Sequence, residues 1–79
     1  MRIARTNEFT LIAYLKSPPY HAVEKPIDYG VQFELASGVI CNFHYKEKTP
    51  DEFSFTVQRH SANPEQAKMI EHFASGIAL

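Results

Sequence analysis

The 79-residue sequence contains a single cysteine, no excess of one charge and no long apolar run. The thiol of Cys41 has no partner for an internal disulfide, which favours a reducing, cytoplasmic setting. A net charge of -1 provides no basic field that would attract nucleic acid regardless of sequence. No apolar stretch approaches the roughly 20 residues of a membrane span or forms a signal-peptide core near the N-terminus. These absences predict a cytoplasmic protein without a membrane segment.

Length and composition indicate one domain that spans residues 1–79. Hydrophobic residues make up 44% of the chain and charged residues 22%, which are ordinary values for a globular protein. A domain of this size buries only about 60% of its unfolded surface, so contact with a second copy is a ready source of further burial. We therefore expect a homodimer.

An alternation of apolar and polar residues dominates the centre of the chain. Odd-numbered positions are apolar through residues 27–35, 39–45 and 53–57, and the even-numbered positions between them are polar or small except at Ile40. This two-residue period is typical of half-buried strands. A three-residue turn at 36–38 then predicts a hairpin in which odd-numbered residues face odd-numbered ones, such as Phe33 opposite Cys41.

The segment of residues 8–16 is apolar on both parities. We interpret it as the first strand, with a short helix as the alternative. Pro18 and Pro19 end it, because proline lacks an amide donor and restricts the residue before it. The loop that continues to Pro26 contains Tyr20 and is long enough to be a candidate binding loop.

A helix is predicted over residues 64–75. Asn63 is its expected N-cap, Pro64 takes the first helical position, and Gln66 is the expected capping-box partner. Apolar residues recur at helical spacing, at Ala67, Ile70, Phe73, Ala74 and Ile77. This stripe must be buried, and the apolar sheet face is the surface available to it. The predicted fold is α+β, a four-stranded antiparallel sheet with one C-terminal helix packed on one face.

No arrangement of residues predicts catalysis or a metal site. The four histidines stand at no zinc-motif interval, and we expect neither a metal nor another cofactor. The predicted register does place Ser54 beside His44, which keeps an enzymatic or small-molecule-binding subunit as a weaker alternative. Because nothing indicates an oxyanion hole or a cavity, we expect a protein that is not an enzyme.

The polar face of the predicted sheet is the main candidate binding surface. It presents hydrogen-bonding side chains without a dominant charge, from Gln32, Asn42, His44, Lys46, Ser54, Thr56 and Gln58. The alternative is that this face is only the solvated side of an antiparallel sheet. A second candidate is a patch or loop formed by Tyr14, Tyr20 and Ile40, because Ile12, Tyr14 and Ile40 interrupt the polar parity.

The order of the predicted elements is similar to that of two groups of nucleic-acid-binding proteins. The helix start Asn63-Pro64-Glu65-Gln66 after a strand resembles the dimeric single-stranded-DNA-binding transcriptional coactivators. The strands at residues 27–33 and 55–58 resemble the TATA-binding-protein-like half-domain at the N-terminus of type III ribonucleases H. Either resemblance implies a module that binds nucleic acid through its sheet.

The sequence as a whole favours a small non-enzymatic interaction protein that binds a partner protein. An inhibitor, an antitoxin-like protein or a phage-encoded accessory protein fits a chain of this size. The alternative is a nucleic-acid-binding module that uses the polar sheet face. Salt dependence distinguishes the two hypotheses, because binding to phosphates weakens steeply as the salt concentration rises.

Overall fold

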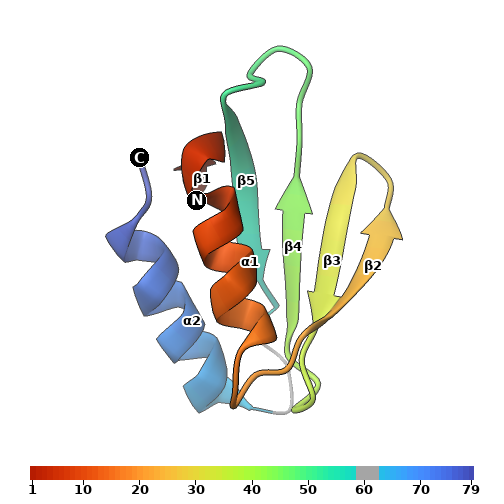
Figure 1. The fold of residues 1–79 in the computed structure, drawn as a ribbon, viewed down its shortest axis with the longest axis vertical. Helices are drawn as coiled ribbons and strands as arrows, with labels where there is room; N and C mark the ends of the chain where they lie inside the picture. The colour runs from red at the N-terminus through yellow and green to blue at the C-terminus, as the bar shows by residue number, and fades with distance from the viewer. Residues whose placement is uncertain (59–62) are drawn as a thin grey trace.

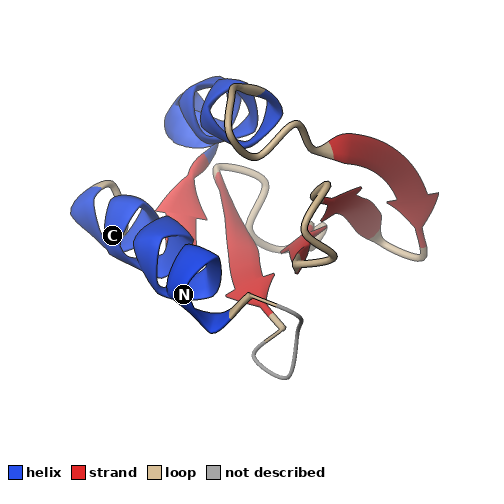
Figure 2. Cartoon of the chain, turned by 90° about the horizontal axis from the view of Figure 1, so that it is seen from below, coloured by secondary structure: helices blue, strands red, loops and turns tan. Residues whose placement is uncertain are grey.

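Two helices cover one face of an antiparallel sheet in the computed structural model, which describes residues 1–58 and 63–79 (Figure 1). The elements in chain order are β1 (Arg2–Ala4), the 3₁₀ turn η1 (Arg5–Asn7), α1 (Glu8–Lys16), β2 (Val23–Ile27), β3 (Gly30–Glu34), β4 (Ile40–His44), β5 (Glu52–Val57) and α2 (Pro64–Gly76). Within the described residues the sheet has five strands in the order β1-β5-β4-β3-β2. Seen from below, α1 lies above the strands and α2 to their left, and the sheet curves away to the right toward β2 (Figure 2). None of the helices described is long and apolar enough to cross a membrane.

The predicted class of fold is confirmed, but the number of elements is not. The antiparallel sheet and the C-terminal helix are present, whereas the described residues form five strands instead of four and a second helix, which lies between β1 and β2. Residues 8–16 form α1 and not a strand. Leu11 and Leu15, one helical turn apart, are fully buried on the side of α1 that faces the sheet. Burial of residues four positions apart is typical of a helix. The sequence did not decide between helix and strand here, because its apolar residues occupy both odd and even positions.

The two edge strands were not predicted. β1 has only three residues, and its central residue Ile3 is buried opposite Phe53 of β5. On its other side, the Leu79 amide donates a hydrogen bond to the Arg2 carbonyl at 3.0 Å, so the C-terminus lies along this edge. β2 contains Pro26 and is largely exposed, so it lacks the alternation that indicates a strand.

The predicted register of the central hairpin is confirmed. Phe33 pairs with Cys41, and Gln32 pairs with Asn42 through a hydrogen bond of 3.0 Å from Gln32 Nε2 to Asn42 Oδ1. At the far end of the hairpin a Cβ atom on Gly30 would lie 1.8 Å from the carbonyl oxygen of Phe43. Only glycine allows the two backbones to approach this closely.

The core lies between the two helices and the sheet face that carries the odd-numbered residues of β1, β3, β4 and β5. Phe43 is at its centre, with its ring centroid 5.2 Å from that of Phe33, 5.0 Å from that of Phe53 and 5.2 Å from that of Phe55. The helices add further fully buried side chains, from Leu11, Leu15, Ile70 and Ala74. Cys41 is also fully buried here, and burial raises the pKa of its thiol to about 12.

The start of α2 agrees with the prediction in part. Asn63 is the N-cap, since its Oδ1 accepts a hydrogen bond from the Gln66 amide at 3.0 Å. The capping-box role of Gln66 is wrong, because its Oε1 accepts a hydrogen bond from Ser37 Oγ at 2.6 Å and so joins α2 to the turn between β3 and β4. Phe73, predicted to pack on the sheet, is half-buried and stacks on Tyr14 of α1 with ring centroids 3.9 Å apart.

Candidate functional site

The sheet face opposite the helices, here called the open face, carries the residues predicted as the main binding surface. Strand register arranges it in three rows across the sheet. The middle row consists of Lys25, Gln32, Asn42 and Thr56. The row nearest the turn between β4 and β5 consists of Ile27, Gly30, His44, Ser54 and Arg2. The third row consists of Val23, Glu34 and Ile40.

The two remaining predicted residues lie at the ends of these strands. Gln58 follows β5, and its amide donates a hydrogen bond of 2.9 Å to the Ile40 carbonyl at the end of the third row. Lys46 lies two residues beyond the end of β4 and lines a hollow together with His44 and Ser54. All seven residues therefore lie on, or at the ends of, neighbouring strands of one sheet.

The charges on the open face are largely paired. Arg2 Nη1 lies 3.2 Å from Glu52 Oε1, and at the opposite edge of the sheet Lys25 Nζ lies 2.9 Å from Glu34 Oε1. Exposed ion pairs of this kind add little stability. Their effect on the surface is to cancel charge, so amide and hydroxyl groups dominate between them. The open face is suited to hydrogen bonding with a neutral or mixed surface.

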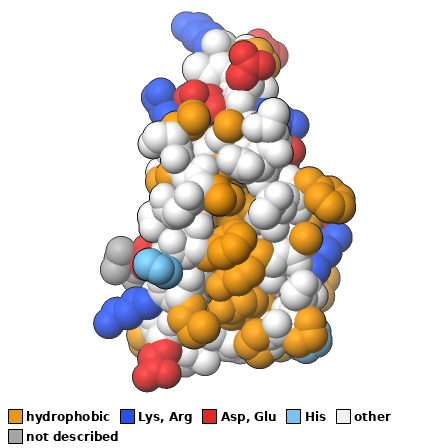
Figure 3. Space-filling view, turned by 60° about the vertical axis from the view of Figure 1, so that its left-hand side comes forward, with side chains coloured by type: hydrophobic (Ala, Val, Ile, Leu, Met, Phe, Trp, Pro, Cys, Tyr) orange, Lys and Arg blue, Asp and Glu red, His pale blue; other side chains and the backbone are white. Residues whose placement is uncertain are grey.

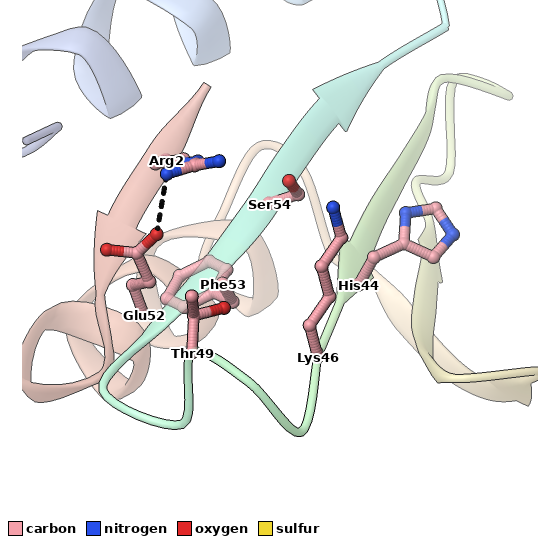
Figure 4. Close-up of a pocket in the computed structure, with 7 residues that line it drawn as sticks. All are labelled: Arg2, His44, Lys46, Thr49, Glu52, Phe53 and Ser54. Carbon is pink, nitrogen blue, oxygen red and sulfur yellow. Dashed lines mark ion pairs between the residues drawn. The ribbon is translucent and has the colours of Figure 1, made fainter.

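A small hollow lies on the open face where β1, β5 and the end of β4 meet (Figure 4). Its volume of about 30 Å³ is close to that of a single water molecule, so it cannot hold an organic substrate. His44 and Ser54 occupy paired positions beside it, as predicted. No hydrogen bond joins their side chains within the described residues.

The described residues also contain no group of three or more His, Cys, Asp or Glu side chains placed to hold a metal ion. Of the four histidines considered in the sequence, His60 lies outside the residues that the structure describes.

The second predicted surface does not form. Tyr20 is only 3% exposed, and its hydroxyl oxygen lies 2.8 Å from that of Tyr14. Burial, reinforced by this hydrogen bond, raises the pKa of Tyr14. Tyr14 and Ile12 belong to α1 on the helical side of the sheet, whereas Ile40 belongs to the open face. Only a strand at residues 8–16 would have placed Ile12 and Tyr14 on the same face as Ile40, and these residues form α1 instead.

Sequence reasoning missed Tyr29, which it assigned to the apolar face of a strand. Tyr29 instead lies in the two-residue turn between β2 and β3, is 85% exposed and has a φ angle of 63°. The turn could have been found from Asp28 and Gly30, because Asp and Gly are characteristic turn residues. Arg2 was missed because β1 is too short to give a periodic pattern.

Comparison of the chain with protein-family models, with curated proteins and with solved structures finds no match.

Proposed function

We propose that this chain is a non-enzymatic interaction protein whose open face binds a partner protein. The observation that supports this proposal best is the combination of hydrogen-bonding rows with apolar side chains on one uncovered surface. Val23 is 62% exposed, and Ile40 lies in the same row beyond Glu34. Protein interfaces typically have such a mixture, with apolar contacts and direct hydrogen bonds side by side.

The charge of the open face agrees with a protein partner. A phosphate backbone would require several unpaired cations, whereas Arg2 and Lys25 are each paired with a carboxylate and Lys46, just beyond β4, is the one unpaired cation of the open face among the described residues. An inhibitor, antitoxin-like or phage-encoded accessory role is compatible with binding of this kind. Binding of nucleic acid by the open face is the alternative.

Affinity capture from the native host with two matched variants tests the proposal. Thr56→Trp places a large ring in the middle row of the open face, and Ser75→Trp places the same ring on the exposed side of α2. We expect Thr56→Trp to lose the partner and Ser75→Trp to retain it, both with parent-like unfolding curves, because solvent-facing substitutions usually change stability by less than about 0.5 kcal/mol. Equal recovery by the two variants would show that the open face is not the binding surface.

Nuclease treatment and graded salt separate the two classes of partner. A protein partner should survive nuclease and elute with a shallow salt dependence. A partner that disappears with nuclease, or whose retention falls steeply between low and moderate salt, would favour the nucleic-acid alternative.

We also propose that the chain forms a homodimer, through a surface of which the sequence analysis identified only Tyr14 as a candidate residue. A band of hydrophobic side chains crosses the helical side of the molecule (Figure 3). Tyr14, Met69 and Phe73 line an open groove there, and Met69 is 56% exposed. Sedimentation equilibrium at micromolar concentration should show a dimer that Met69→Lys converts to a monomer. A parent protein that sediments as a monomer would overturn this proposal.

A further inference from the structure

A second hollow lies beyond the end of the open face, where the turn between β2 and β3 meets the segment that follows β4. It has a volume of about 520 Å³, within the range of sites that hold small ligands. Its lining residues are Tyr29, His44, Tyr45, Lys46, Glu47 and Lys48. His44 and Lys46 also line the smaller hollow beside Arg2, so the two hollows adjoin. This larger one has both an aromatic wall and a basic wall.

Tyr29 provides the exposed part of the aromatic wall. Its φ angle of 63° is in the left-handed region, where a bulky side chain is rare and where Gly, Asn or Asp would be favoured in a hairpin turn. An 85% exposed ring gains almost nothing from packing that could offset this strain. Such an outlier is typical of functional positions. The backbone is held in place, because the Tyr45 amide donates a hydrogen bond of 2.8 Å to the Tyr29 carbonyl.

Tyr45 forms the fixed part of the same wall. Its hydroxyl donates a hydrogen bond to the Glu8 carboxylate, and the Arg5 guanidinium lies over its ring at 4.4 Å from the centroid. These contacts anchor Tyr45 to η1 and α1, so one of its ring faces is already occupied. Tyr29 is the aromatic side chain of the hollow that remains available for stacking.

The basic wall is formed by Lys46 and Lys48. Both are exposed, and neither forms an ion pair within the described part of the chain. Glu47 between them is the only carboxylate of the lining, so the hollow has a net positive charge even with His44 neutral. Proteins that bind single-stranded nucleic acid combine these two features, because an aromatic ring stacks on the base and cations bind the phosphate.

We propose that this hollow binds a nucleotide, with the base stacked on Tyr29 and the phosphate held by Lys46 and Lys48. The nucleotide is either a free mononucleotide or one residue of a single strand, because both present the same base and phosphate. This site adjoins the open face, with which it shares His44 and Lys46, but it does not depend on the binding of a partner protein there. It also requires no chemical step, because the hollow contains no group positioned to react with a nucleotide.

Titration of the ¹⁵N-labelled protein by NMR tests the site. Adenosine monophosphate should shift the amide signals of residues 28–30 and 44–48, and adenosine or inorganic phosphate alone should bind at least about tenfold more weakly. A single-stranded oligonucleotide is titrated in parallel. An affinity well above that of the mononucleotide identifies a strand as the ligand, and an equal affinity identifies a free nucleotide. Absence of shifts with both probes at millimolar concentration would overturn the proposal.

Variants at one position separate binding from folding. Tyr29→Asn suits the left-handed backbone, so it should unfold at the same or a higher temperature than the parent, yet raise the Kd by about tenfold. Tyr29→Phe keeps the ring and should retain the parent Kd within about twofold. Lys46→Gln with Lys48→Gln should reduce binding of the monophosphate to the level of adenosine. If Tyr29→Asn binds like the parent, stacking on Tyr29 is not part of the site and the proposal fails.

Discussion

Truncation of Phe43 to alanine should destabilise this protein more than truncation of any other ring that the structure describes. Phe43 is fully buried and contacts three other phenylalanine rings. Loss of a buried phenylalanine costs about 3–5 kcal/mol, and each ring pair contributes about 0.5–1.5 kcal/mol beyond burial. We therefore expect Phe43→Ala to lose about 5 kcal/mol of unfolding free energy. A domain of this length has about 4–12 kcal/mol in total, so this loss takes a large part of it.

Phe73 is the matched comparison, because it is the same side chain in a different environment. It is half-buried, and its one aromatic contact among the described residues is with Tyr14 on the helical side of the molecule. Half of the usual burial and one stacked pair amount to about 2 kcal/mol. From the sequence alone, which placed Phe73 on the sheet, the expected cost would be about 3 kcal/mol or more. The structure therefore lowers the expected effect of Phe73→Ala.

Urea unfolding followed by far-ultraviolet circular dichroism measures the difference. The midpoint for Phe73→Ala should fall moderately, and Phe43→Ala should be largely unfolded at 25 °C or unfold at very low urea. If Phe43→Ala cannot be purified, Phe43→Leu replaces it and should still lose about 1–2 kcal/mol. Equal losses for the two alanine variants, or a parent-like Phe43→Ala, would refute the assignment of Phe43 to the centre of the core.

Three further predictions concern Gly30, Asn63 and Cys41. Gly30→Ala should lower unfolding free energy by about 3 kcal/mol in urea titrations, since the new Cβ meets the Phe43 carbonyl, whereas Gly76→Ala, with nothing within 4 Å, should be neutral or stabilising. Asn63→Ala should cost about 1 kcal/mol in the same assay and Asn63→Asp almost nothing, and equal losses would argue against the cap. The raised pKa of the Cys41 thiol, about 12 when folded against about 8.5 when unfolded, gives stability that is complete below pH 8.5 and declines toward pH 12. Urea midpoints between pH 7 and 11 should therefore fall less for Cys41→Ala than for the parent, and parallel profiles would contradict this.

The central hairpin was predictable because all of its information is local. The turn at 36–38 sets the register, and the alternation on either side of it sets which residues are buried. The partner of each strand is also its neighbour in sequence, so no long-range contact had to be guessed. Asn63 was predictable for the same reason, since a cap depends only on the residues that follow it.

The elements that sequence reasoning missed are those defined by distant partners. β1 pairs with β5 about fifty residues later, and three residues carry no period of their own. α1 and a strand are both compatible with the apolar segment 8–16. Residues 8–16 form a helix because Leu11 and Leu15 are then buried against the sheet, and the strands of that sheet are distant in sequence. Tertiary context overrides weak local preference in such segments.

The polar residues of the candidate site were predicted from the sequence, but the ion pairs on the same face were not. The polar positions of β3, β4 and β5 follow from parity, so their common face was correct. The ion pairs that neutralise this face involve Arg2 and Lys25, which belong to the two unpredicted strands. The exposure of Tyr29 was missed because parity was extended from residue 27 to residue 35 through what is a turn at 28–29.

The edges of the sheet help to decide how a partner approaches. An exposed edge strand invites strand addition by another chain. The outer edge of β1 is occupied by the C-terminal residues, through the Ala78 bridge to Ile3 and the hydrogen bond from Leu79. The outer edge of β2 pairs with no strand among the described residues, but Pro26 lacks an amide and the charged side chains of Glu24 and Lys25 border it. Both edges thus resist backbone pairing, whereas the open face between them presents side chains from every strand. A partner is therefore expected to recognise side chains on the face, which is why a single ring at Thr56 should be enough to block it.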